Sequence, residues 1–336
     1  MIYKNVEVFN VGEIMEKDGV MTWLRVPQNV YDNLDGEQGR NMAKACTGVE
    51  LRFIMESDTV TLRMRTKGNE GVFHVYRGSM QGGWEDHQVN KNVGEETSDF
   101  VIKQTDRPQI LDKIRKESNL PMSSYVIRVI FDRGVYELLD IIGDVRPPEP
   151  KMLPERTLLC YGSSITHGSN SIDASHSWPY LLAHNLKVDC RNLGFAGSCL
   201  MEKDFVEYIA SEGEQARWDI ATLELGINAL GWDEDKIVER VSNTLTQICG
   251  RNQDKPIFVI SPFYNMDDYE ATGQSDKWRR LIEQEVKKAG YANVTYINGN
   301  DLLGDMSLIS ADYVHPNIYG AMQIAERLTA VMKEKI

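Results

Sequence analysis

The stretch TLLCYGSSITHG, at residues 157–168, decides how the second half of the chain is interpreted. It begins with a run of apolar residues whose length suits a buried strand. This run leads into a glycine-led turn that contains two adjacent serines, Ser163 and Ser164. Such a segment can be an ordinary turn, a phosphate-binding loop or the position of a nucleophile. The segments that follow it decide between these interpretations.

Apolar runs alternate with amphipathic segments from residue 157 to the end of the chain. In the last amphipathic segment Ile318, Met322, Ala325 and Leu328 recur at helical spacing. Near-continuous hydrophobic strands separated by helices are typical of a parallel sheet that is covered on both faces. The sequence therefore predicts a three-layer α/β/α domain, flavodoxin-like, with a mainly parallel five-stranded sheet. The predicted strands are TLLCYG, VDCRNLG, DIATLELG, PIFVISPF and NVTYING, and the predicted helices cover 177–187, 201–212, 234–249, 275–289 and 317–334.

The first part of the chain shows a different pattern, in which apolar residues alternate with polar ones. In residues 49–56 and 59–66 every second side chain is hydrophobic, which predicts strands with one buried and one solvated face. Several such strands, separated by turn residues, favour an antiparallel β-sandwich or jelly roll. The predicted strands cover 49–56, 59–66, 71–78 and 123–132, with a short helix near 109–117.

A proline-rich segment, VRPPEPKMLPER at residues 145–156, separates the two patterns. Proline stiffens the chain and cannot donate to a strand ladder, so the segment is typical of a linker or a strap. We therefore expect a β-sandwich domain at residues 1–148 and an α/β domain at residues 149–336. Two domains also suit a chain of 336 residues.

The composition excludes several classes of protein. Hydrophobic residues make up 42% and charged residues 26%, as in folded globular proteins. The net charge is −13 without a stripe of Lys and Arg, so neither a nucleic-acid partner nor a membrane partner is expected. The N-terminus lacks the layout of a secretory signal and no apolar run has the length of a membrane span, which predicts a cytoplasmic protein. The five scattered cysteines, without a C-x-x-C pair, favour reduced thiols over disulfides or a zinc site.

Polar residues follow four of the five predicted strands. Residues 162–166 follow the first strand, 192–197 the second and 226–228 the third. Residues 312–316 follow the fifth strand, just before the last helix. Because functional groups gather at the carboxyl ends of the strands in open α/β sheets, we expect these four segments to meet.

Three of these residues form a chemically sensible set. A serine hydroxyl needs a base that accepts its proton during attack, and histidine has a suitable pKa, so Ser164 is the predicted nucleophile and His315 the predicted base. A carboxylate on the other ring nitrogen fixes the tautomer and stabilises the imidazolium, which is the role we predict for Asp312. The α/β-hydrolase fold is disfavoured, because Thr166 occupies the place of the second glycine of its Gly-x-Ser-x-Gly elbow.

The four segments, in this order, resemble those of the SGNH or GDSL hydrolases, a family of serine esterases and lipases. The resemblance covers the second domain and implies an oxyanion hole made by the backbone N–H of Ser164, the backbone N–H of Gly197 and the side chain of Asn228. Such donors stabilise the charge that develops on the carbonyl oxygen. The chain departs from the family pattern at Ser163, where the Asp of GDSL is expected, and at Ala229, where an Asp often follows the asparagine. Both departures concern the residues that support the site.

The sequence YGSSITHG, at residues 161–168, is similar to that of a subgroup of these hydrolases. Members of this subgroup carry an N-terminal β-sandwich and often act on carbohydrates. The resemblance implies a deacetylase or short-chain esterase that forms an acyl-enzyme on a carbohydrate or similar hydroxylated substrate, with neither a cofactor nor a metal. Two alternatives stay open. The same triad can serve an acyltransferase, and a Ser/Thr-rich loop after the first strand of a flavodoxin-like sheet can bind phosphate or FMN. The oligomeric state is open.

Overall fold

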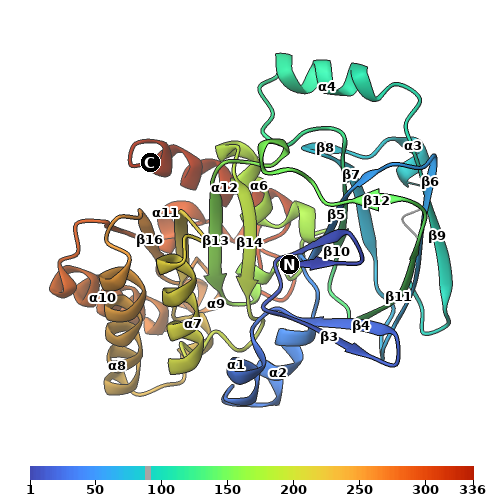
Figure 1. Ribbon diagram of the computed structural model, residues 1–336. Coiled ribbons are helices and arrows are strands. Elements are labelled where there is room, and N and C mark those ends of the chain that lie inside the picture. Colours follow the sequence, from blue (N-terminus) through green and yellow to red (C-terminus); the bar gives the residue numbers. More distant parts are fainter. Residues whose placement is uncertain (88–91) are drawn as a thin grey trace. The chain divides into compact units, whose positions relative to one another are not determined.

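The structure, a computed structural model, describes residues 1–87 and 92–336, without the side chain of His87. The chain divides into two compact units (Figure 1). The first unit comprises Met1–Gln28, Ala43–Glu155 and Lys187–Asp189, and the second comprises Asn29–Met42, Arg156–Leu186 and Cys190–Ile336. A short segment from the N-terminal part of the chain thus belongs to the second unit. The domain boundary at 148/149 stays a prediction.

The first unit contains two antiparallel sheets whose side chains share one hydrophobic core, as the sequence predicts. Leu51 and Phe53 come to this core from one sheet, and Leu62 and Met64 from the other. The sheet order is β1-β2-β5-β10-β7-β8, with β12 beside β5, in the first sheet and β3-β4-β11-β6-β9 in the second. The strands are β1 (Ile2–Tyr3), β2 (Val6–Phe9), β3 (Glu13–Lys17), β4 (Val20–Leu24), β5 (Glu50–Met55), β6 (Thr59–Thr66), β7 (Phe73–Arg77), β8 (Met80–Gln81), β9 (Ser98–Lys103), β10 (Val126–Phe131), β11 (Tyr136–Ile142) and β12 (Val145–Arg146).

Strand β5 differs from the sequence expectation. The alternation predicted one solvated face, and β6 has the expected alternating burial, but every residue of β5 is buried. Glu50 and Arg52 lie on the face that was expected to be wet, and both side chains are inaccessible. Arg52 Nε donates to Glu50 Oε2 over 2.8 Å, and Arg128 Nη2 lies 2.6 Å from Glu50 Oε1. The mutual pairing of these charges offsets the cost of removing them from water.

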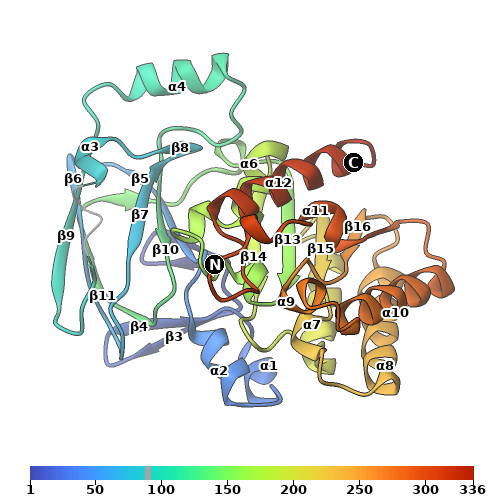
Figure 2. The same ribbon diagram turned by 180° about the vertical axis from the view of Figure 1, so that it is seen from behind.

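The second unit contains the predicted five-stranded sheet, in the order β14-β13-β15-β16-β17. Strands β13 and β15, β15 and β16, and β16 and β17 pair in parallel. Helices cover both faces, with α6 and α12 on one face and α7, α8 and α10 on the other (Figures 1 and 2). The strands are β13 (Thr157–Gly162), β14 (Asp189–Gly194), β15 (Ile220–Glu224), β16 (Ile257–Ile260) and β17 (Val294–Ile297).

The five predicted helices of the second half are present. The segment at 234–249 consists of an α-helix that ends at Thr244 and a π-helical turn, Leu245–Cys249. The last helix begins at Ile318 because the side chain of Asn317 accepts a hydrogen bond from Gly320 N over 3.0 Å. No helix in the described parts of the chain is both long and apolar enough to cross a membrane. The helices are α1 (Gln28–Asp32), α2 (Glu37–Lys44), α3 (Trp84–His87), α4 (Pro108–Glu117), α5 (Ser164–His167), α6 (Trp178–Leu186), α7 (Lys203–Glu214), α8 (Glu234–Thr244), α9 (Met266–Tyr269), α10 (Gln274–Ala289), α11 (Gly299–Leu302) and α12 (Ile318–Lys333).

Candidate active site

Three of the predicted site residues are joined by hydrogen bonds within the second unit. His315 Nε2 lies 2.7 Å from Ser164 Oγ, and His315 Nδ1 lies 2.7 Å from Asp312 Oδ2. Ser164 opens the short helix α5 where β13 ends. Asp312 and His315 lie on the loop that leads into α12. The geometry allows a proton to pass from the serine hydroxyl to the imidazole while the carboxylate holds the other ring nitrogen.

Asp312 is held in place by several donors besides His315. Its Oδ1 accepts the backbone N–H groups of Val314 and His315 over 3.1 and 3.0 Å. Asn170, just beyond α5, donates Nδ2 to Asp312 Oδ2 over 2.6 Å. Partial burial raises the pKa of Asp312, but the hydrogen bonds from His315 outweigh this effect and lower the pKa to about 2. The carboxylate is therefore ionised at neutral pH. Sequence reasoning missed Asn170, whose partner lies far away in the chain.

A fully buried carboxylate, Glu224, lies under the serine turn. Its Oε2 accepts the backbone N–H of Ser163 over 2.7 Å, the hydroxyl of Ser163 over 2.7 Å and the hydroxyl of Thr166 over 3.0 Å. The Ser163 hydroxyl oxygen in turn accepts the backbone N–H of Ile165 over 3.1 Å and so caps α5. The backbone is thus fixed on both sides of Ser164.

The space around Glu224 leaves no room for a side chain at position 162. A Cβ on Gly162 would lie 2.6 Å from Glu224 Oε2 and closer still to the Thr166 hydroxyl. Burial raises the pKa of Glu224 to about 7, although the hydrogen bonds from Ser163 and Thr166 act in the opposite direction. Glu224 Oε1 has no hydrogen-bond partner among the described residues. Sequence reasoning missed Glu224, although a glutamate inside an apolar strand was a visible signal.

The predicted oxyanion residues lie on the next two loops. Gly197 follows β14 with φ +67°, a conformation that favours glycine. Asn228 lies in a short 3₁₀ turn after β15, and its Oδ1 accepts the backbone N–H of Cys199 over 3.1 Å. Because the backbone N–H of Cys199 can only donate, it bonds the amide oxygen of Asn228. The Nδ2 group of Asn228 takes no part in this hydrogen bond. Within residues 1–87 and 92–336, the N–H of Ser164, the N–H of Gly197 and the Nδ2 of Asn228 have no acceptor.

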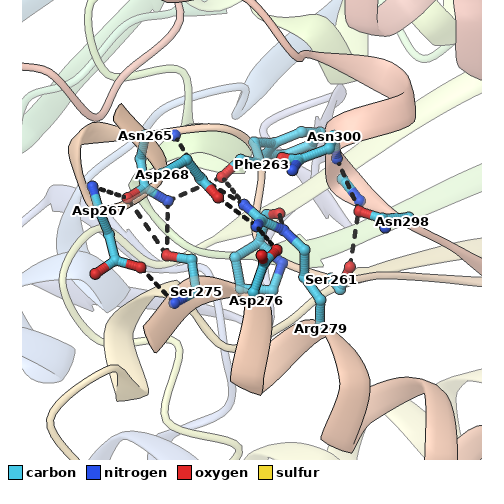
Figure 3. Close-up of polar contacts among 12 residues, drawn as sticks. Ser261, Phe263, Asn265, Asp267, Asp268, Ser275, Asp276, Arg279, Asn298 and Asn300 are labelled. Carbon is cyan, nitrogen blue, oxygen red and sulfur yellow. Dashed lines mark hydrogen bonds and ion pairs between the residues drawn. The ribbon is translucent and has the colours of Figure 1, made fainter. Parts of the chain in front are cut away.

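The loop after the fourth strand carries no predicted site residue, but it contacts the loop of Asp312 and His315. Met266 N donates to Tyr313 O over 3.0 Å. Figure 3 shows the buried Arg279 of α10, whose Nη2 donates to Asp268 over 2.8 Å and to the carbonyl of Phe263 over 3.0 Å. This buried arginine fixes the loop after β16, which in turn supports the segment that carries the histidine.

Potential metal ligands do not cluster in the described parts of the chain. No group of three or more His, Cys, Asp or Glu side chains is placed to hold a metal ion in residues 1–87 and 92–336. All five cysteines are buried free thiols. The polar groups linked to the Ser164 hydroxyl are the imidazole of His315, which bonds it directly, and the carboxylate of Asp312, which bonds the histidine.

Several solved structures share this fold. A salicylyl-acyltransferase, SsfX3, from a tetracycline biosynthetic pathway is 16% identical over 98% of this chain and 95% of that one, with a TM-score of 0.79. A putative GDSL-like lipase from Bacteroides ovatus is 16% identical over 98% and 96%, with a TM-score of 0.70. A family two carbohydrate esterase from Clostridium thermocellum, in complex with cellohexaose, is 15% identical over 98% and 99%, with a TM-score of 0.64.

The sequence itself identifies the family. No curated protein sequence matches the chain. Residues 155–333 match the model of the GDSL-like lipase/acylhydrolase family, and this region is more than half of the chain. It contains Ser164, Asp312 and His315 together with both predicted oxyanion residues, Gly197 and Asn228. The chain belongs to the GDSL-like lipase/acylhydrolase family.

Proposed function

We propose that the protein is a serine-dependent ester hydrolase that acts through an acyl-enzyme. The hydrogen-bond chain from Ser164 through His315 to Asp312 supports this proposal most strongly. His315 Nε2 accepts the hydroxyl proton as Ser164 Oγ attacks the ester carbonyl. Asp312, which is ionised, stabilises the imidazolium that results.

The oxygen of the attacked carbonyl becomes an oxyanion that needs donors. The N–H of Ser164, the N–H of Gly197 and Nδ2 of Asn228 carry no other hydrogen bond in the described chain and suit this role. When the tetrahedral intermediate collapses, the C–O bond to the alcohol breaks, and the alcohol leaves with the proton from His315. Water then attacks the acyl group on Ser164 and gives its own proton to His315, which returns it to the serine as the acid departs.

The serine turn is a poor phosphate cradle. The donors that a phosphate would need, the hydroxyls of Ser163 and Thr166 and the N–H of Ser163, all point at the carboxylate of Glu224. A phosphate could use these donors only by taking them from Glu224, which would leave the buried carboxyl group without its hydrogen bonds. This arrangement weakens the alternative of a flavodoxin-like module for phosphate or FMN.

The proposed substrate is a short-chain ester, such as an acetyl ester, of a carbohydrate or similar hydroxylated compound. Solved carbohydrate esterases of the same fold support the alcohol portion. The solved salicylyl-acyltransferase supports a second candidate, in which an alcohol replaces water in the last step. The two candidates share the acyl-enzyme, so adding sugars to the assay and separating free acid from transferred ester distinguishes them.

Hydrolysis of p-nitrophenyl acetate by purified Ser164→Ala protein tests the proposal. We expect the activity and the covalent labelling by a fluorophosphonate to be lost, because no other hydroxyl bonds His315 Nε2 in the described chain. Ser211→Ala is the control, since Ser211 lies on α7 and its hydroxyl donates to Glu207. Labelling of folded Ser164→Ala at the wild-type level would refute the proposal.

A further inference from the structure

A side chain from the N-terminal part of the chain reaches the second loop of the candidate active site. Gln38, on α2, donates Nε2 to the carbonyl oxygen of Ala196 over 2.8 Å, although 158 positions separate the two residues. The same side chain is the nearest group to Gly197, since a Cβ built there would lie 3.6 Å from Gln38 Cγ and Nε2. The Ser198 hydroxyl also donates to Ala196 O, over a longer distance of 3.4 Å.

The carbonyl that Gln38 binds belongs to the peptide that carries the N–H of Gly197. A trans peptide is planar, so its C=O and N–H point in opposite directions. A donor that holds the carbonyl of Ala196 therefore also sets the direction of the Gly197 N–H. Gly197 adopts φ +67°, and glycine is the residue with the fewest steric limits on its backbone. This peptide is the central one of a turn that the Ser198 N–H closes on the carbonyl of Phe195 over 3.0 Å. The central peptides of turns occur in two opposite orientations, so the contact from Gln38 adds a constraint on the direction of this one.

The segment that carries Gln38 is itself fastened to helices of the second unit. Asn33 Nδ2 donates to Asp204 Oδ2 of α7 over 2.6 Å. Arg240 of α8 donates Nη2 to Asp35 Oδ2 over 3.2 Å. The segment Asn29–Met42, which includes Gln38, belongs to the same compact unit as the candidate active site. Gln38, which donates to the carbonyl of Ala196, thus lies on a segment that hydrogen bonds hold to α7 and α8.

We infer that Gln38 is a positioning residue of the oxyanion site, which holds the peptide of Ala196 and Gly197 so that the Gly197 N–H faces the reacting oxygen. The inference rests on the proposed function and extends it to a residue outside the region 155–333. Gln38 acts through the peptide and has no role in proton transfer. Its loss weakens stabilisation of the transition state more than binding of the substrate.

Two variants of the full-length protein separate the hydrogen bond from packing. Gln38→Met keeps the length of the side chain without a donor, and Gln38→Glu places a carboxylate against the Ala196 carbonyl. The measured quantity is kcat for p-nitrophenyl acetate per fluorophosphonate-labelled site. We expect it to fall about tenfold for Gln38→Met and further for Gln38→Glu. The loss is smaller than the factor of about 10²–10³ that removal of a whole oxyanion donor costs, because the Gly197 N–H is misdirected and not removed. KM changes by less than about twofold, and the inhibition constant of an arylboronic acid, which forms a tetrahedral adduct, rises in step with the loss of kcat/KM.

Gln323→Ala is the matched control, because Gln323 also donates Nε2 to a carbonyl, that of Leu302 over 3.3 Å, and lies on α12. It should leave kcat and boronate binding unchanged. Wild-type kcat in both Gln38 variants, or a loss confined to KM, would overturn the inference. If Ser164→Ala is inactive while both Gln38 variants behave as wild type, only the role of Gln38 fails. If Ser164→Ala keeps full activity, the proposed function itself fails.

Discussion

His315 Nε2 lies 2.7 Å from the hydroxyl oxygen of Ser164, although 151 positions separate the two residues. The serine stands at the end of β13, and the histidine lies on the loop before α12. Each residue is positioned by its own local hydrogen bonds, Ser164 by the turn over Glu224 and His315 by the loop of Asp312. The contact therefore depends on two independently supported loops, and variants in either loop test it.

Asn228→Ala should lower kcat by about 10²–10³ and leave KM nearly unchanged, because one oxyanion donor is lost. Steady-state kinetics with p-nitrophenyl acetate measure this effect. Asn228→Asp is the matched variant, since it keeps an oxygen that can accept from the backbone N–H of Cys199 but has no Nδ2. A folded Asn228→Asp protein with wild-type kcat would remove Asn228 from the oxyanion site.

Asp312→Asn should lower kcat by about 10³ or more with little loss of folding, because the amide misdirects the tautomer of His315. The pKa of Asp312 is lowered to about 2, so its charged form stabilises the fold above its ordinary pKa, and this contribution disappears as the pH falls toward 2. The difference in the free energy of unfolding between wild type and Asp312→Asn should therefore shrink on acidification. The difference is small, since the carboxylate is 41% exposed. A gap that widens on acidification, measured by urea denaturation, would be inconsistent with the lowered pKa.

Glu224→Gln should change how stability depends on pH. The pKa of Glu224 is raised to about 7, so between its ordinary value and 7 the folded protein binds more protons than the unfolded chain. Wild-type stability therefore falls as the pH rises through this window, by at most about 1.4 kcal/mol per pH unit for one proton. Glu224→Gln lacks this proton, so its stability relative to wild type should improve from about pH 5 to about pH 8.

Urea denaturation at several pH values measures this difference. Glu326→Gln, on the exposed surface of α12, controls for the general effect of removing one negative charge. Parallel stability curves for wild type and Glu224→Gln would show that the carboxyl group under the serine turn does not titrate in this window.

Arg279→Met should destabilise the fold by about 3–5 kcal/mol, because it leaves the largely buried carboxylate of Asp268 without its charged partner and with only the backbone N–H of Asn265. Lys277→Met on the same helix is the control, since its ion pair with Glu234 is exposed and should contribute little. The loop after β16 supports Tyr313, so kcat should also fall in the arginine variant. Thermal denaturation and kinetics measure both effects. A stable and fully active Arg279→Met protein would show that the loop of His315 needs no support from Arg279.

Local patterns in the sequence were sufficient to predict the sheet, its helices and the β-sandwich. The spacing of apolar residues and the length of an apolar run depend only on neighbouring residues. The apolar strands and the helix at 317–334, which were predicted from these features, are confirmed. The alternation in residues 49–56 predicted a wet face that does not exist, because burial depends on partners such as Arg128 that are distant in the chain.

The supports of the candidate site were harder to predict for the same reason. The first loop has Ser163 where the family pattern has an Asp, so the sequence shows no carboxylate at this position. In the structure a carboxyl group from another strand, that of Glu224 on β15, bonds Ser163. Gln38 binds a backbone carbonyl, which carries no sequence signal at all. Residues with side-chain chemistry, such as Ser164 and His315, could be proposed from their types and loops, but contacts to the backbone require coordinates.

The most direct test of the central claim is the trapping of the acyl-enzyme. Wild-type protein is mixed with an activated acetyl ester, quenched in acid and digested, and the peptides are examined by mass spectrometry. The account predicts one acetyl group on Ser164 in wild type and none on this peptide in Ser164→Ala. Active enzyme that carries the acetyl group on another residue, or that turns over rapidly in the Ser164→Ala form, would contradict it.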